Sequence, residues 1–174
     1  FDLKDSVRRI EAFYDDILRH DVRPLTLGGD HTLSLPILRA MAKKHGPLAL
    51  LHIDAHADIN SHMFGEEIAH GTPFRRAFEE ELLDADQVFQ IGLRGTGYTA
   101  EDFDWASERG FQVVQAEQLW HQSAAPLMDQ IRQQIGARPV YLSFDIDSLD
   151  PAYAPGTGTP EIGGLTSIQA LEII

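Results

Sequence analysis

Short apolar runs alternate with longer amphipathic stretches along the chain. Residues 48–53 are nearly all apolar, and a run of this length is typical of a strand buried on both faces of a sheet. Similar runs predict further strands at residues 24–27, 87–94, 111–116 and 140–144. The stretches between them predict helices at residues 5–19, 34–45, 73–83, 100–109 and 123–135.

The order of these elements indicates an α/β fold. Strands and helices follow one another, which implies βαβ units and a mainly parallel sheet with helices on both faces. Thr166 and Gln169 form a capping box, which predicts the start of one more helix. No linker, repeat or low-complexity segment interrupts the pattern, so we expect residues 1–174 to form a single domain.

Composition narrows the class of protein. The 174 residues are 43% apolar, which suits a folded domain, and no run approaches the ~18 apolar residues that a membrane helix needs. The net charge of −13 argues against nucleic acid or an anionic membrane as a partner. The chain has no cysteine, hence no disulfides or thiolate ligands, which is consistent with a cytoplasmic enzyme. Because the chain opens on Phe1 and closes on Ile174 within a helical pattern, we expect it to be incomplete at both ends.

Acidic residues and histidines follow three of the predicted strands. The C-terminal ends of parallel strands form the edge at which open α/β sheets bind ligands. The spacings Asp-x-His-x-Asp and Asp-x-Asp place alternate side chains on the same side of an extended backbone. We therefore expect six side chains to meet at this edge: His31, Asp54, His56, Asp58, Asp145 and Asp147.

Such a group of carboxylates requires compensation of its charge. Four ionised carboxylates would repel one another, so either cations bind or some carboxylates are protonated. Four carboxylates and two imidazoles suit two divalent ions. Oxygen and imidazole ligands without sulfur favour Mn(II), although they also admit Fe, Co or Zn.

Three motifs carry a resemblance to a known family. They are Gly28-Gly29-Asp30-His31, then Asp54-Ala55-His56-Ala57-Asp58, then Ser143-Phe144-Asp145-Ile146-Asp147-Ser148-Leu149-Asp150-Pro151. Together they resemble the metal motifs of the ureohydrolases, the family of arginase and agmatinase. The segment from His70 to Arg76 is similar to the agmatinase and guanidinobutyrase branch of that family.

The resemblance implies a three-layer α/β/α sandwich and two Mn(II) ions per subunit. By position, His31, Asp54, Asp58 and Asp145 would bind one ion, and Asp54, His56, Asp145 and Asp147 the other. The ions would activate a water that attacks the guanidinium carbon. His70 matches the family's proton shuttle, so urea and a primary amine would leave.

The substrate is less constrained than the reaction. Asn60, Met63 and Thr159 are the candidate substrate-binding residues, and agmatine and 4-guanidinobutyrate are the candidate substrates. The acidic residue that arginases carry after the strand at residues 91–94 is missing here. Guanidinopropionase, arginase, a single-zinc deacetylase-like hydrolase and a non-catalytic homologue remain as alternatives. The family also implies a homo-oligomer, a trimer or a hexamer.

Overall fold

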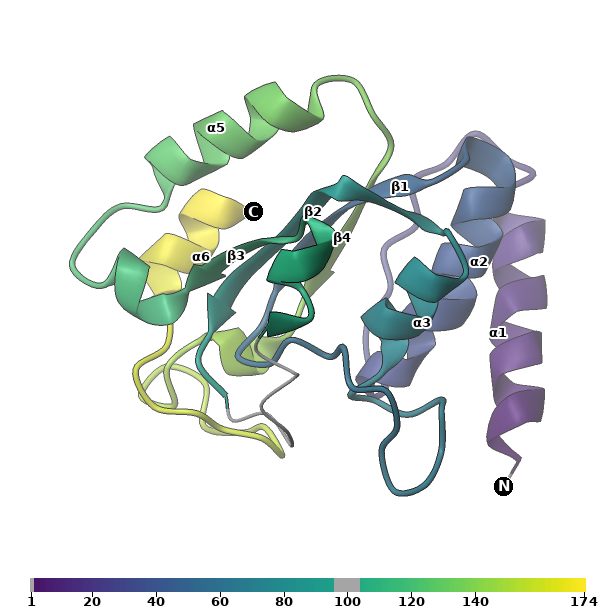
Figure 1. Cartoon of the computed structure of the whole chain (residues 1–174), viewed down its shortest axis with the longest axis horizontal. Coiled ribbons are helices and arrows are strands. Elements are labelled where there is room, and N and C mark those ends of the chain that lie inside the picture. Colours follow the sequence, from purple (N-terminus) through teal and green to yellow (C-terminus); the bar gives the residue numbers. More distant parts are fainter. Residues whose placement is uncertain (1, 96–103) are drawn as a thin grey trace. The chain divides into compact units, whose positions relative to one another are not determined.

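The computed structural model describes residues 2–95 and 104–174 (Figure 1). The chain divides into two compact units. The first contains Phe1–Leu48 and Asp58–Asp84, and the second contains Ala49–Ala57 and Ala85–Ile174. The single domain expected for residues 1–174 remains a prediction.

Helices build the first unit. Helix α2 (Ser34–His45) packs against α1 (Leu3–Ile17) and α3 (Pro73–Glu79). Leu35 and Leu38 of α2 and Phe74 of α3 are completely buried, and they form the apolar core of this unit. At the surface, Arg39 donates two hydrogen bonds to Glu80, at 2.6 and 2.7 Å, and thereby links α2 to the end of α3.

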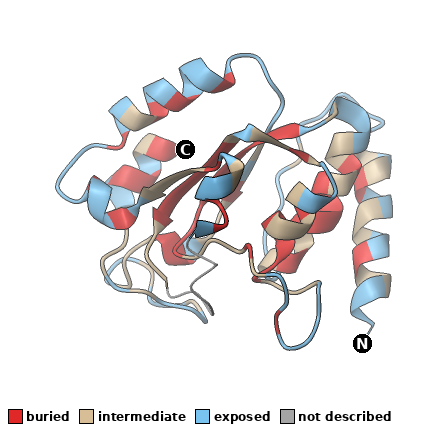
Figure 2. Ribbon diagram, viewed as in Figure 1, coloured by how far each residue is buried: buried red, intermediate tan, exposed pale blue. Residues whose placement is uncertain are grey.

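A four-stranded sheet builds the second unit. Its strand order is β3-β2-β1-β4, with β1 at Leu48–Ile53, β2 at Leu83–Leu93, β3 at Gln112–Gln115 and β4 at Val140–Phe144. Strand β1 is parallel to β4, and β2 is parallel to β3. Every residue of β1 is buried (Figure 2).

Helices α5 (Ala125–Ile135) and α6 (Ser167–Ile173) cover one face of this sheet. Alternate residues of β1 and β2 pack with residues of α5 at helical spacing. The contacting residues are Ala49, Leu51, Ile53, Phe89, Ile91, Met128, Ile131, Ile135 and Ile173. Full burial of one such side chain is worth about 1.5–3 kcal/mol, so this cluster stabilises the unit.

Several predicted elements are confirmed. The helix at residues 34–45 and the strands at 48–53 and 140–144 have the predicted bounds, and the capping box opens α6. The helix predicted at residues 73–83 is shorter, because Glu81 has a left-handed φ of 57° and β2 begins at Leu83. The helix predicted at residues 100–109 falls partly outside the described residues, and its described end is a short 3-10 helix, Ser107–Arg109.

The strand predicted at residues 24–27 is wrong. This segment has no strand structure, and Leu25 and Leu27 are 86% and 87% exposed. A short segment such as Pro24-Leu25-Thr26-Leu27 forms a strand only where a neighbouring strand pairs with its backbone, and no strand pairs with it among the described residues. His31 therefore follows an exposed segment and begins the 3-10 helix His31–Leu33.

Within the described part of the chain, no helix has the length and apolar character needed to cross a bilayer.

Candidate metal centre

The chain leaves the sheet at Asp54, directly after β1. The backbone N–H of Asp54 still donates to the carbonyl of Ile91 on β2, at 3.1 Å. Its side chain then turns back, because Oδ1 accepts the backbone N–H of His56 at 2.7 Å. Asp54 is only 1% exposed, so its carboxylate is a buried group held by its own turn.

Strand β4 ends in a turn of its own. The N–H of Asp145 donates to the carbonyl of Ile53 at 2.9 Å, which places the end of β4 beside the end of β1. Asp145 then caps the 3-10 helix Ile146–Ser148, since its Oδ1 accepts the N–H of Asp147 at 3.0 Å. Asp145 keeps the expected extended backbone, with φ −83° and ψ 136°, but the extended backbone expected for Asp147 is wrong because Asp147 lies within the 3-10 helix.

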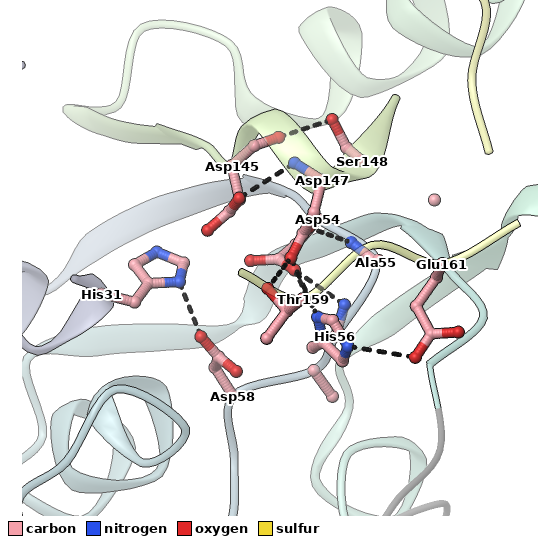
Figure 3. A network of polar contacts seen from close by, with 12 residues as sticks. His31, Asp54, Ala55, His56, Asp58, Asp145, Asp147, Ser148, Thr159 and Glu161 are labelled. Carbon is pink, nitrogen blue, oxygen red and sulfur yellow. Dashed lines mark hydrogen bonds and ion pairs between the residues drawn. The ribbon is translucent and has the colours of Figure 1, made fainter. Parts of the chain in front are cut away.

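Asp54, His56 and Asp147 form one cluster in the second unit (Figure 3). One potential ligand atom from each residue lies within 4.8 Å of the others. Nδ1 of His56 is 3.2 Å from Oδ2 of Asp147 and 3.5 Å from Oδ1 of Asp54. Asp147 is 2% exposed, and its other oxygen accepts the N–H of Ala55 at 3.1 Å.

The electrostatics of this cluster favour positive charge. Hydrogen bonds from His56 to Asp147 and then to Asp54 raise its pKa from 6.5 to about 11. Carboxylates that stabilise a proton on His56 to this degree would also attract a divalent cation, which would take the place of that proton. Oxygen and imidazole donors without sulfur fit a hard or borderline ion such as Mn(II).

His31 and Asp58 form a pair in the first unit. Nδ1 of His31 lies 2.6 Å from Oδ2 of Asp58 (Figure 3). The ring of Phe74 packs edge-on against His31, with 5.0 Å between the ring centroids. Asp58 has a left-handed φ of 51°, so the extended Asp-x-His-x-Asp backbone expected from the sequence is wrong at this position. The carbonyl of Asp58 accepts the N–H of Phe74 at 3.2 Å, a bond to the first turn of α3 that holds the residue in this conformation.

The candidate residues Asn60 and Met63 lie at the base of a loop in the first unit. Both the backbone N–H and Nδ2 of Asn60 donate to the carbonyl of Gly71, each at 3.0 Å. Met63 is 7% exposed, and a Cβ added at Gly71 would lie 2.6 Å from its Cε. These contacts close the loop; a role of either residue in substrate binding remains a prediction.

His70 lies in the same loop. Its side chain is partly buried, and its ring is 6.1 Å from that of Phe64, which is 84% exposed at the tip of the loop. An imidazole at a partly exposed position can exchange protons with solvent, as a proton shuttle must.

Thr159 and two residues that the sequence did not indicate surround the cluster in the second unit. Oγ1 of Thr159 donates to Oδ2 of Asp147 at 2.8 Å. Oε1 of Glu161 lies 3.6 Å from Nε2 of His56. The guanidinium of Arg94 donates to the backbone carbonyls of Asp147 and Glu161, each at 2.7 Å. Neither Glu161 nor Arg94 belongs to a ligand-like spacing, although both lie in segments that follow a strand.

Comparisons with known proteins agree with this arrangement. The model of the arginase family matches residues 1–174. The chain is 68% identical to a guanidinobutyrase of Pseudomonas aeruginosa and 57% identical to a human mitochondrial guanidino acid hydrolase, in both cases over its full length. It covers 54% and 49% of these proteins, so the chain spans about half the length of the curated relatives it matches.

A solved structure shows the same fold. The proclavaminate amidino hydrolase of Streptomyces clavuligerus superposes on 99% of this chain with a TM-score of 0.93 and 42% identity, and 57% of that protein is covered. This likeness confirms the predicted arginase-like fold with a parallel sheet and flanking helices. Fold, family model and sequence identity agree, and the chain belongs to the arginase family.

Proposed function

We propose that this protein hydrolyses a guanidino compound to urea and a primary amine with the help of two Mn(II) ions. The observation that carries the proposal is the cluster of Asp54, His56 and Asp147 after β1 and β4, in a chain of the arginase family. The cluster has the donors that a divalent cation requires, and its carboxylates favour positive charge.

We propose six residues as metal ligands: His31, Asp54, His56, Asp58, Asp145 and Asp147. Support within the second unit comes from the short distances among Asp54, His56 and Asp147, and from the bond between Asp145 and the N–H of Asp147. Support within the first unit comes from the 2.6 Å pair of His31 and Asp58. Bound ions would lower the pKa of a water, so that hydroxide is available near neutral pH to attack the guanidinium carbon.

The remaining steps fall to side chains of this chain. Thr159 orients Asp147 through its hydroxyl, and His70 supplies the proton that the leaving amine needs. His70→Asn is expected to lower kcat strongly without changing the amount of bound manganese.

For the substrate we propose a guanidino acid, 4-guanidinobutyrate in the first place. The support comes from two relatives, a guanidinobutyrase and a guanidino acid hydrolase, to which the chain is 68% and 57% identical. Agmatine differs from 4-guanidinobutyrate in ending with a cation instead of a carboxylate, and it is the second candidate. We further propose a cytoplasmic homo-oligomer, a trimer or a hexamer, as the family resemblance implies.

The test is urea release by the full-length protein loaded with manganese. The substrates are 4-guanidinobutyrate, agmatine, 3-guanidinopropionate and arginine, with Asp147→Asn as the inactive control. We expect the highest kcat/KM with 4-guanidinobutyrate. Hydrolysis of agmatine alone would contradict the proposed substrate. If none of the compounds released urea, the proposed reaction would be wrong, and the result would favour a non-catalytic homologue or a deacetylase-like hydrolase.

A further inference from the structure

A histidine and a glutamine lie together on β1 and β2, on the face of the sheet opposite the α5–α6 core. His52 and Gln90 are both 0% exposed. Their strand neighbours Leu51, Ile53, Phe89 and Ile91 pack into that core, so the alternation of the strands places His52 and Gln90 on the other face. Burial of two polar side chains is unfavourable unless hydrogen bonds compensate for the lost water.

The carbonyl of Ala57 determines the orientation of the Gln90 amide. Nε2 of Gln90 donates to this carbonyl at 2.7 Å. A carbonyl only accepts hydrogen bonds, so the reversed amide would bring two oxygens together. In this orientation Oε1 of Gln90 is buried and has no hydrogen-bond partner among the described residues. The protein therefore tolerates an unpaired oxygen in order to direct the NH2 group of Gln90.

The second N–H of Gln90 determines the position of the proton on His52. Nε2 of Gln90 lies 3.1 Å from Nδ1 of His52, and an amide nitrogen can only donate. Nδ1 must then accept, so the ring N–H that remains is the one on Nε2. That nitrogen lies 2.8 Å from Oδ2 of Asp54, so His52 donates to the Asp54 carboxylate.

We propose that Gln90, acting through His52, is a positioning residue that orients the Asp54 carboxylate for metal binding. The inference rests on the proposed function, in which Asp54 is a ligand. Oδ2 of Asp54 accepts from His52 and Oδ1 accepts from the N–H of His56, so both oxygens of the carboxylate are held in a fixed orientation. Gln90 also donates to the carbonyl of Ala57, so the turn that carries Asp54 and His56 is held at Asp54 through His52 and at Ala57 directly.

The experiment measures manganese binding rather than catalysis. The full-length protein and Gln90→Leu are stripped of metal, and stoichiometry and dissociation constants for Mn(II) are measured by titration calorimetry. Loss of a group that orients a ligand typically weakens metal binding by about 10- to 100-fold, and we expect a change of this size for Gln90→Leu. Gln87→Leu is the matched control, because Gln87 lies on the same strand outside the network, and it should bind manganese as the unaltered protein does.

The role of His52 is tested by pairing the substitutions. His52→Gln keeps an NH2 group near the position of Nε2 and should retain most of the affinity, whereas His52→Leu should lose it. Gln90→Leu should cost less in the His52→Leu protein than in the unaltered one, because its effect passes through the histidine. Additive effects, or unchanged affinity in Gln90→Leu, would overturn the inference.

A spectroscopic measurement on the unaltered protein makes the inference independent of how the variants fold. Long-range 1H–15N spectra of the histidine rings, with His52→Gln for assignment, should show the proton of His52 on Nε2 and none on Nδ1. A proton on Nδ1 would overturn the inference. A protein that binds manganese, loses affinity in Gln90→Leu and releases no urea would refute the proposed function and leave this inference standing.

Discussion

The hydroxyl of Thr159 donates a hydrogen bond to Oδ2 of Asp147 at 2.8 Å. The sequence placed Thr159 at the substrate and Asp147 at a metal, and the structure joins them. Oδ2 of Asp147 is also the oxygen nearest Nδ1 of His56, at 3.2 Å. The loop that follows β4 thus returns to the end of the same strand, where Thr159 contacts the Asp147 carboxylate. The threonine therefore has two candidate roles, which are to orient Asp147 and to bind the substrate.

The substitution Thr159→Val removes the hydroxyl and keeps the shape of the side chain. If the hydroxyl orients Asp147, manganese affinity and kcat should fall by about tenfold and KM should change little. Thr157→Val is the control: its hydroxyl lies in the same loop and only accepts the N–H of Thr159 at 3.5 Å, so this substitution should have a much smaller effect. A rise in KM without loss of manganese affinity would instead assign the hydroxyl to the substrate.

Arg94 holds the loops behind the cluster by hydrogen bonds to backbone carbonyls. The acceptors are Gly92, Asp147, Ser148, Leu149, Glu161 and Ile162, at 2.7 to 3.3 Å. Lysine cannot reproduce this planar set of donors, so Arg94→Lys should lower the free energy of unfolding by about 2–3 kcal/mol in urea titrations. Arg132→Lys, whose side chain is exposed beside Asp129, is the control, and equal effects of the two substitutions would contradict the prediction.

Asp150 gives the fold a defined dependence on pH. Backbone N–H groups of Ala152, and then of Gly163 and Gly164, hold the pKa of Asp150 below its ordinary value of 3.8. A carboxyl whose pKa is lowered by folding stabilises the protein above the unfolded pKa, and this contribution is lost as the pH falls through the folded pKa. Asp150→Asn should therefore be less stable than the unaltered protein at neutral pH, and the difference should shrink below pH ~4.

Thermal unfolding of both proteins between pH 3 and 8 measures this difference. Asp129→Asn is the control, since Asp129 pairs only weakly with Arg132 on the surface of α5, at 3.3 Å. A constant gap in stability between Asp150→Asn and the unaltered protein across this range would show that the charge of Asp150 has no part in it.

Gly71 has no side chain, and the space beside it is occupied by Met63 and Asn60 at the base of the loop that carries His70. An added Cβ would lie 2.6 Å from Cε of Met63 and 2.9 Å from Nδ2 of Asn60. Gly71→Ala should displace these side chains, lower the free energy of unfolding by about 1–3 kcal/mol and reduce urea release. Gly156→Ala is the matched control, because nothing lies within 4 Å of its added Cβ, and equal losses in both variants would refute the steric explanation.

Much of the fold was predictable from local signals. The short apolar run of β1 is typical of a strand that is buried on both faces of a sheet, and all six residues of β1 are indeed buried. Helix α2 ends where Gly46 adopts a left-handed φ of 76°, a conformation that glycine adopts readily. The segment at residues 24–27 failed because a short apolar run contains no information about whether a neighbouring strand is present to pair with it.

The chemistry of the site was also predictable from the sequence, but its geometry was not. The number and kind of carboxylates and imidazoles predicted a cation site, since such groups require compensation of charge wherever they meet. The helical turn at Asp147 and the left-handed backbone at Asp58 depend on hydrogen bonds to a cap and to α3, which the residue spacing does not reveal.

By itself, the sequence determined the class of fold, the family and the candidate ligands, because apolar periodicity and residue type are local properties. Only the tertiary structure decided which groups surround these candidate ligands: Arg94, Thr159, Glu161 and the pair of His52 and Gln90. The sequence distance between His52 and Gln90 is 38 residues, and Arg94 and Glu161 are 67 apart. Contacts of this kind arise when neighbouring strands and their loops pack together, so no pattern within a single segment predicts them.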